Sequence, residues 1–325
     1  MLKGRPRVVD LFAGAGLLSY AFQKEGFEVI RAVEINRLAA ATYAANLSAH
    51  VEIGDVTRAQ PRGRCEVLVA GPPCQGFSTL GRRDPRDPRN RLSLHVVKWA
   101  WAMKPKVVVI ENVAAFLTSP VWKTLARRLN ALGYAVSAHV LNAFDFGAPQ
   151  LRMRSFTIAS KRPIDAPRSV VRGQRTVRDA FEGLSLDPDG KNHHYAPAPS
   201  QIALKRMRVI PPGGDKRDVM RHRPELAPPS WWTLNRVEIT DVWGRMHWDR
   251  PSNTLRTALQ NASKGRYIHP EQNRVISLRE AARLQTIPDS WHFEGEPYPI
   301  ARQIGNSVPP VLGRAIARTV RTALE

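Results

Sequence analysis

Short β-rich runs alternate with helical stretches between residues 7 and 160, and this alternation constrains the fold more than any other feature of the sequence. The runs span 8–12, 28–33, 65–70, 107–110, 135–141 and 156–159. Two intervening segments, 92–103 and 121–132, carry apolar residues at helical spacing and are long enough to return the chain for parallel pairing. The alternation predicts an α/β fold with a doubly wound sheet, in which ligands bind at the carboxyl ends of the strands.

The sequence becomes irregular after about residue 161, with Pro, Arg, His and Trp scattered through it to about residue 265. Order returns at Ser277, whose hydroxyl and the Glu280 carboxylate form a capping box that predicts a helix ending before Pro288. The segment 311–324 has one apolar helical face and is predicted to pack back on the first domain. We therefore expect one large domain and a second, smaller, loop-rich domain.

The chain has 325 residues and a formal net charge of +21, which comes mainly from arginine. Guanidinium groups suit bidentate contacts with phosphate and guanine, so nucleic acid is the predicted partner, ahead of a membrane surface or an acidic protein. No apolar run approaches the roughly 20 residues that span a bilayer, and the N-terminal sequence lacks a secretory apolar region. We expect no membrane association and a reduced, cytoplasmic location.

The segment 71–78, Gly-Pro-Pro-Cys-Gln-Gly-Phe-Ser, directly follows the apolar run 67–70. Consecutive prolines fix φ and remove two backbone donors, so a stiff loop holds the Cys74 sulfur in one place and predicts a nucleophile there. The other cysteine, Cys65, has no comparable frame. Neither the cysteines nor the pair 193–194, His-His, has partners at metal-ligand spacing, so no metal site is expected.

A carboxylate and two arginines occur where they could act beside that sulfur. Glu111 directly follows the apolar run 107–110. Apolar surroundings would make its carboxyl group a proton donor or a strong hydrogen-bond partner. The alternative is an acid at a strand end whose hydrogen bonds are satisfied within the protein. Alternation along a strand places Gln150, Arg152 and Arg154 on one side. A positive pair near the sulfur would favour thiolate and stabilise negative charge on a substrate oxygen, although a solvated strand edge is the alternative.

A thiolate, an acid and an arginine together suit addition to a pyrimidine ring. Sulfur adds to C6 of cytosine, which makes C5 nucleophilic enough to attack a sulfonium methyl group; loss of the C5 proton and of sulfur then restores the ring. A cytosine stacked in duplex DNA is out of reach for this reaction. The base must therefore be extruded from the helix.

The segment 10–16, Asp-Leu-Phe-Ala-Gly-Ala-Gly, follows the first β-rich run and precedes a helix. Glu34 comes about 20 residues later, where an acid accepts from ribose hydroxyls. Ser19 stands where a dinucleotide fingerprint needs a third glycine, so a pyrophosphate turn is disfavoured. Phe12 offers a face for adenine and Asp55 an acceptor for its amino group. The alternative to a nucleoside site is that these glycines only form a turn and that the acids are solvated.

These blocks together resemble the bacterial-type DNA (cytosine-5)-methyltransferases nearly end to end. The matching segments, in family order, are 10–16, 34, 54–55, 72–78, 111–113, 150–154, 274–289 and 303–310. The resemblance implies a Rossmann-like, S-adenosylmethionine-dependent methyltransferase domain with a smaller target-recognition domain. It also implies methyl transfer to C5 of a cytosine flipped out of duplex DNA within a specific short sequence, through a covalent Cys74–C6 adduct.

The resemblance implies a role for each matching residue. Cys74 is the nucleophile, Glu111 contacts N3 and the exocyclic amine, and Arg152 and Arg154 orient the base. The cofactor-binding positions are Phe12, Gly14, Gly16, Glu34 on ribose, Asp55 on adenine, and Asn306 near the methionine end. The DNA-binding positions are Gln75, Ser78, Arg82, Arg83 and, near the target phosphate, Thr254. The sequence departs from the family at Leu17, where a glycine is usual, so the backbone approaches the cofactor less closely there.

The same resemblance divides the chain into four parts. Residues 1–164 form the catalytic and cofactor-binding domain, 165–272 the target-recognition domain, 273–300 a connecting helix and hinge, and 301–325 a C-terminal helix that returns to the catalytic domain. A monomer acting on double-stranded DNA is expected, with a cognate restriction endonuclease as a separate companion. Four tryptophans of the recognition segment, Trp231, Trp232, Trp243 and Trp248, could stack on bases, but core packing is the favoured interpretation.

Two alternatives share parts of this sequence pattern. A methyltransferase of the same family that acts on tRNA would use the same catalytic residues, but the DNA-type Pro-Cys loop and the long recognition segment favour DNA. A DNA-binding regulator that kept the fold and lost the chemistry is disfavoured because Cys74, Glu111 and Arg154 are all present.

Overall fold

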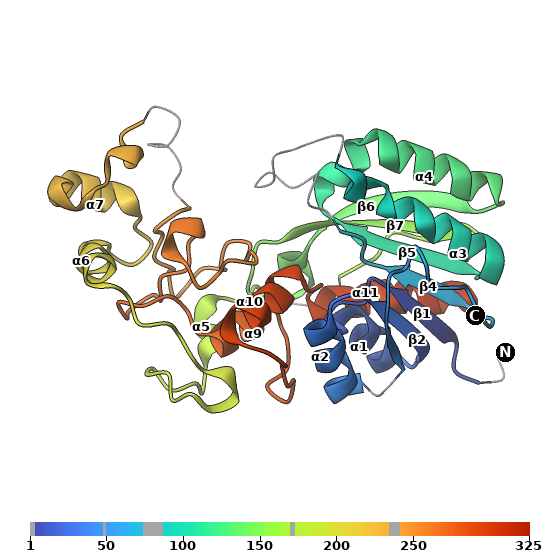
Figure 1. Ribbon diagram of the computed structural model, residues 1–325, viewed down its shortest axis with the longest axis horizontal. Helices are drawn as coiled ribbons and strands as arrows, with labels where there is room; N and C mark the ends of the chain where they lie inside the picture. The colour runs from blue at the N-terminus through green and yellow to red at the C-terminus, as the bar shows by residue number, and fades with distance from the viewer. Residues whose placement is uncertain (1–3, 48–49, 74–86, 170–172, 234–240) are drawn as a thin grey trace. The chain divides into compact units, whose positions relative to one another are not determined.

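The computed structural model describes residues 4–47, 50–73, 87–169, 173–233 and 241–325 (Figure 1). The chain divides into two compact units. The first unit comprises Met1–Phe146, Met153–Val171 and Val308–Glu325, and the second comprises Gly147–Arg152 and Arg172–Ser307. Segment 273–300, expected to be a separate connector, falls within the second unit together with residues 301–307.

A seven-stranded sheet forms the first unit, in the order β3-β2-β1-β4-β5-β7-β6. The strands are β1 (Arg7–Leu11), β2 (Glu28–Glu34), β3 (Val51–Ile53), β4 (Val67–Ala70), β5 (Val107–Asn112), β6 (Ala135–Asn142) and β7 (Met153–Ser160). Strands β1 to β5 pair in parallel, whereas β7 lies between β5 and β6 and is antiparallel to both. The predicted α/β sheet is confirmed, and the antiparallel insertion of β7 adds to it.

Helices cover both faces of this sheet (Figure 1). Helices α3 (His95–Met103) and α4 (Pro120–Ala131) lie on one face, and α1 (Leu17–Lys24), α2 (Arg37–Leu47) and α11 (Pro310–Leu324) lie on the other. The 3₁₀ helices of this unit are η1 (Pro88–Leu94), η2 (Ala114–Thr118) and η3 (Ala143–Phe146). Helix α4 begins where Ser119 Oγ accepts from the backbone N–H of Trp122 and a proline occupies the first turn, so its start is set by local sequence.

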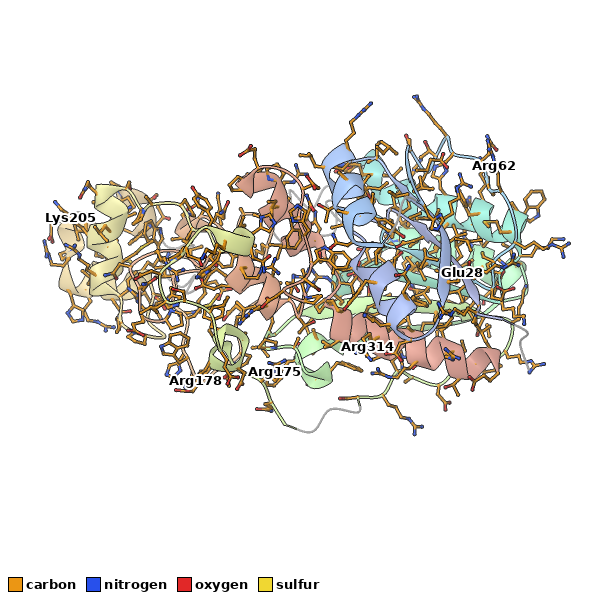
Figure 2. All side chains as sticks on the ribbon, turned by 90° about the horizontal axis from the view of Figure 1, so that it is seen from below. Glu28, Arg62, Arg175, Arg178, Lys205 and Arg314 are labelled. Carbon is orange, nitrogen blue, oxygen red and sulfur yellow. The ribbon has the colours of Figure 1, made fainter. Side chains whose placement is uncertain are left out.

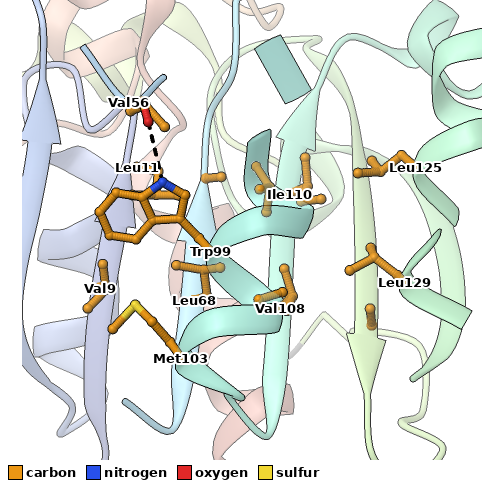
Figure 3. Packing of buried hydrophobic residues seen from close by; sticks show 14 of the residues in the cluster. Val9, Leu11, Val56, Leu68, Trp99, Met103, Val108, Ile110, Leu125 and Leu129 are labelled. Carbon is orange, nitrogen blue, oxygen red and sulfur yellow. Dashed lines mark hydrogen bonds between the residues drawn. The ribbon is translucent and has the colours of Figure 1, made fainter. Parts of the chain in front are cut away.

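The core under α3 is built around Trp99, which is fully buried. Its indole packs with Leu11, Leu68 and Ile110 from three neighbouring strands (Figure 3). The indole N–H donates to the carbonyl of Val56 at 3.4 Å, so the one polar atom of the ring is satisfied. This packing holds β1, β4 and β5 from one side and fixes the edge at which their carboxyl ends meet.

Helix α11 packs closely on α1 across the opposite face. Gly313 makes this approach possible, because a Cβ atom there would lie 2.7 Å from the Cβ of Ala21. Glu25, just beyond α1, adds charge contacts: its carboxylate accepts from Arg314 Nε at 2.6 Å and from Arg318 Nη1 at 3.0 Å. The C-terminal helix is thereby part of the first unit, as its apolar face predicted.

We predict that Gly313→Ala lowers the free energy of unfolding. The added methyl group must push α11 from α1, which costs roughly 1–3 kcal/mol and exceeds the gain of about 1 kcal/mol in helix propensity. Thr322→Ala, at an exposed position of the same helix, is the matched control and should be neutral or slightly stabilising. Denaturant unfolding of both variants measures the difference; a Gly313→Ala protein as stable as the control would contradict the tight contact.

The second unit is built from short helices and loops. Its helices are α5 (Val177–Phe181), α6 (Gln201–Val209), α7 (Lys216–His222), α9 (Leu278–Leu284) and α10 (Pro297–Asn306), with 3₁₀ helices η4 (Lys191–His193), η5 (Pro224–Leu226), η6 (Pro229–Trp231) and η7 (Ala262–Lys264). The described residues of this unit form isolated bridges and no strand. Ser277 and Glu280 form the predicted capping box, and α9 ends at Leu284, before Pro288, as expected.

Buried arginines satisfy the carbonyls of these loops. Arg245 is 3% exposed and donates to the carbonyls of Met207, Ile210, His269 and Gln272. Arg279 binds the Asn192 and Trp291 carbonyls in the same manner. Irregular backbone leaves carbonyls without ladder partners, and a guanidinium with five N–H groups can serve several of them at once.

Many other basic side chains lie on the surface. Figure 2 shows Arg62 of the first unit and Lys205 of the second extending away from the ribbon, and both are exposed. Within the described residues, no helix is both long enough and apolar enough to cross a bilayer.

Candidate active site

The turn after β1 is shaped for a ligand. Phe12, Gly14 and Gly16 all adopt positive φ, at 57°, 56° and 90°. A Cβ atom at Gly16 would lie 2.8 Å from side-chain atoms of Tyr43 and Leu47, so both conformation and space require glycine there. The turn therefore exposes backbone at the carboxyl end of the first strand, where a doubly wound sheet binds ligands.

Glu34 holds this turn from the end of β2. One carboxylate oxygen accepts from the backbone N–H of Gly14 at 2.7 Å, and the other accepts from that of Asn36 at 2.7 Å. The side chain is 8% exposed. Each oxygen has a second lone pair, so the carboxylate can hold the turn and accept from a ligand hydroxyl.

Asp55 lies at the neighbouring strand end. The backbone N–H of Gly54 donates to the Glu34 carbonyl at 2.9 Å, which ties the segment after β3 to β2. The backbone N–H of Thr57 donates to Asp55 Oδ1 at 2.8 Å, and this hydrogen bond lowers the pKa of the Asp55 carboxyl. Asp55 is therefore an ionised acceptor.

An exposed apolar side chain beside Glu34 was missed by sequence reasoning. Ile35 is 67% exposed and follows Glu34 directly. Apolar surface next to a ribose acceptor suits a flat aromatic ring. Its position in the sequence, immediately after Glu34, could have identified it as a contact for the ligand.

A buried polar network supports the same turn and was also missed. Asp10 is 1% exposed, and its Oδ2 accepts from the Ser19 hydroxyl at 2.7 Å. The Tyr43 hydroxyl donates in turn to Ser19 Oγ at 3.1 Å. Burial raises the pKa of Asp10 to about 7 and also raises that of Tyr43. Ser19 thus stands in place of a fingerprint glycine because its hydroxyl satisfies a buried carboxyl group.

We predict that burial of Asp10 makes the free energy of unfolding fall as the pH rises. Its pKa is about 7 in the folded protein against an ordinary value of 3.8, so the folded state binds more protons across that interval and loses stability as pH rises through it. Between about pH 4 and pH 8, wild type should lose roughly 3–4 kcal/mol relative to Asp10→Asn, which stays neutral. Denaturant midpoints across that range measure this, with exposed Asp165→Asn as the control. Identical pH profiles for wild type and Asp10→Asn would contradict the shifted pKa.

Glu111 lies where the predicted Pro-Cys loop begins. Strands β4 and β5 are parallel neighbours with Ala70 opposite Ile110, so Gly71, the first residue after β4, lies beside Glu111 of β5. A Cβ atom at Gly71 would be 3.9 Å from Glu111 Oε2. Asn112 Nδ2 donates to the Pro72 carbonyl at 3.3 Å and ties the start of the loop to the end of β5. Glu111 is 9% exposed.

The loop residues that carry the expected nucleophile and DNA contacts lie outside the described residues. The described part of the loop ends at residue 73 and resumes at residue 87. The predictions that fall between these limits concern Cys74, Gln75, Ser78, Arg82 and Arg83.

The structure brings Arg154 to Glu111. Strand β7 runs antiparallel beside β5, and Arg154 Nε lies 3.0 Å from Glu111 Oε1. The two side chains are 15% and 12% exposed, so the ion pair is largely shielded from water. A shielded arginine beside a carboxylate fixes its orientation and supplies positive charge to whatever binds there.

Arg152 is placed elsewhere, and the expectation that Gln150, Arg152 and Arg154 lie along one strand is wrong. Strand β7 begins only at Met153, and the residues before it belong to the second unit. Arg152 is fully buried and donates to the carbonyls of Leu255, Gly305 and Ser307 at 2.7–3.0 Å. It positions backbone of the second unit and is not a group for the substrate.

The remaining predicted positions also belong to the second unit. The Thr254 hydroxyl donates to the Leu151 carbonyl at 2.6 Å, and Asn306 is exposed as the last residue of α10. Trp231 and Trp243 are 7% and 8% exposed, which confirms core packing for both, whereas Trp232 is 51% exposed.

The second cysteine, Cys65, has an unreactive thiol. Cys65 is 5% exposed in the core of the first unit, and burial raises the pKa of its thiol to about 12. It stays protonated near neutral pH and is a poor nucleophile. Within the described ranges, no group of three or more His, Cys, Asp or Glu side chains could hold a metal ion.

The sequence is similar to that of known proteins over nearly its whole length. The sequence profile of the C-5 cytosine-specific DNA methylase family matches residues 6–322. The chain is 34% identical to the Type II methyltransferase M1.HphI of Haemophilus parahaemolyticus, over 96% of this chain and 86% of that protein. It is 31% identical to the Type II methylase M.HgiDII of Herpetosiphon aurantiacus, over 98% and 96%.

Solved structures share the fold. An E. coli prophage protein described as a DNA modification methyltransferase superposes with a TM-score of 0.71 at 26% identity, covering 98% of this chain and 99% of that one. The S. pombe Dnmt2 methyltransferase superposes with a TM-score of 0.62 at 19% identity, covering 98% and 99%, and shows the fold alone.

Proposed function

The chain belongs to the C-5 cytosine-specific DNA methylase family, and from this premise we propose that it methylates its cytosine through a covalent bond between Cys74 and C6. It is an S-adenosylmethionine-dependent DNA (cytosine-5)-methyltransferase of the kind found in Type II restriction-modification. The observation that supports the covalent route most is the Glu111–Arg154 pair beside Gly71, three residues before Cys74 in the sequence.

The turn after β1, together with the residues that follow β2 and β3, suits an adenosyl group. Glu34 is the ribose acceptor, Asp55 the acceptor for the adenine amino group, and Phe12 with Ile35 the apolar contacts, while Gly14 and Gly16 let the backbone come close. Asn306 is proposed at the methionine end, because the segment 303–310 resembles the closing segment of the family. When bound, S-adenosylmethionine supplies an electrophilic sulfonium methyl group.

The reacting end suits a cytosine ring. The Cys74 thiolate adds to C6, so C5 becomes nucleophilic and bonds to the methyl carbon while the bond from that carbon to the sulfonium sulfur breaks. Glu111 holds N3 and the exocyclic amine, and Arg154 keeps the Glu111 carboxyl oriented and stabilises charge at the ring carbonyl. A base then removes the C5 proton, its electron pair forms the C5–C6 double bond and the C6–S bond breaks, which restores the aromatic ring and the free thiolate.

The base must leave the helix to enter this site, so we propose that the target cytosine is flipped out of duplex DNA. Gln75, Ser78, Arg82 and Arg83 of the loop, with Thr254 of the second unit, are proposed to contact the DNA. The first unit is the catalytic domain in this proposal, and the second recognises a specific short sequence.

We further propose that the protein acts as a monomer bound to cellular DNA, with a separate restriction endonuclease as its companion. The Type II names of its relatives support the companion endonuclease, and its net charge of +21 supports binding to DNA.

Covalent trapping tests the nucleophile. Bisulfite sequencing of DNA exposed to the enzyme first identifies the methylated site, and a duplex with 5-fluorocytosine at that position is then incubated with enzyme and cofactor. Wild type should form a complex that survives denaturing electrophoresis, because fluorine cannot leave as a proton does. Cys74→Ser should form none.

Cys65→Ser is the matched control and should trap like wild type, because its thiol is buried and protonated. Total tRNA offered in place of duplex DNA should accept no methyl group. Equal trapping by Cys74→Ser and wild type would show that the nucleophile has been assigned to the wrong residue.

A further inference from the structure

The second unit contains a cavity of about 510 Å³ that the methyl-transfer chemistry does not use. It lies between the start of α6, η6 and η7, and much of its wall is apolar, including Pro199, Ile202 and Pro228. Its volume falls within the range of small-molecule sites. Helix α6 is labelled in Figure 1.

Arg206 enters this cavity from α6 in a fixed position. Its Nε donates to the Leu226 carbonyl at 2.8 Å, and its guanidinium carbon lies 5.1 Å from the Trp231 ring centre and 5.2 Å from that of Trp243. The two indole rings are 5.7 Å apart. Stacking on two aromatic faces and one backbone bond lock the plane of the guanidinium.

The terminal nitrogens of Arg206 have no acidic partner among the described residues, and none of the described residues that line the cavity is Asp or Glu. Burial lowers the pKa of Arg206, as expected for a cation without a counter-charge. A locked guanidinium fork that faces no carboxylate is ready to bind two adjacent acceptors.

Gln260 adds a second donor on the cavity wall. Its amide nitrogen is buried and has no hydrogen-bond partner in the part of the chain that the structure describes. A buried donor without a partner is costly, and an acceptor on a ligand would satisfy it.

We propose that this cavity binds a guanine base presented by an unpaired nucleotide of the DNA. Guanine carries two adjacent acceptors, O6 and N7, which match the Arg206 fork, whereas adenine and cytosine each place an amino donor on that edge. The apolar wall suits the faces of a planar ring, and Gln260 can donate to a further acceptor. The proposal extends the proposed DNA recognition by the second unit to one base and one pocket.

Equilibrium dialysis of labelled guanosine monophosphate against the full chain tests this site. Saturating S-adenosylmethionine is present throughout, so that the nucleotide cannot occupy the adenosyl site. Guanosine monophosphate should bind saturably, and adenosine and cytidine monophosphates at least about tenfold more weakly. Arg206→Lys, which keeps the charge but loses the fork, should weaken binding about tenfold.

Arg208→Lys is the matched control, because Arg208 is exposed on the same helix and does not line the cavity. It should bind guanosine monophosphate like wild type. Gln260→Leu, which removes the second donor and keeps the pocket apolar, should weaken binding independently of any effect of Arg206→Lys on folding.

Three results would overturn the proposal: no saturable binding up to about 10 mM, displacement by inorganic phosphate at equal concentration, or unchanged binding in both Arg206→Lys and Gln260→Leu. Displacement by phosphate would mean that the cavity binds anions only. Methyl transfer to duplex DNA is measured separately. Active enzyme without guanine binding refutes this site alone, and inactive enzyme with guanine binding refutes the methylation proposal alone.

Discussion

The tie between the ends of β4 and β5 is the contact on which the proposed chemistry depends. Asn112 holds the Pro72 carbonyl, and the same strand end presents Glu111 to Arg154. Because side chains alternate along a strand, a shift of β5 by one residue would turn Glu111 to the opposite face of the sheet. Its register is fixed twice, by parallel pairing with β4 and antiparallel pairing with β7, and the Trp99 core holds the strands beneath it.

The backbone N–H and carbonyl groups find their hydrogen-bond partners in different ways in the two units. In the first unit the sheet pairs its own N–H and carbonyl groups, so side chains at the strand ends are left for ligands. In the second unit, Arg152, Arg245 and Arg279 bind loop carbonyls. Part of the arginine excess is therefore structural. A net charge read from sequence indicates the class of partner, but it does not say which arginines are available to that partner.

Local patterns predicted the parts of this protein that local sequence controls. The strand runs, the capping box at Ser277 and the apolar face of α11 follow from spacing of a few residues. The position of β7 between β5 and β6 depends on pairings between distant segments, and the strand begins only at Met153, so Gln150 and Arg152 were wrongly expected to lie on it. The Asp10–Ser19–Tyr43 network was missed for the same reason, since Tyr43 is 24 residues from Ser19 in the sequence.

Exchange of tritium from C5 of the target cytosine into water measures addition of sulfur to the ring, with or without methyl transfer. If Glu111 acts on the ring as proposed, Glu111→Gln should slow this exchange at least about a hundredfold. Glu34→Gln, which alters the cofactor end, should exchange near the wild-type rate. Exchange by Glu111→Gln at the wild-type rate would contradict the account, because the carboxyl group beside the Pro-Cys loop would then take no part in activating the base.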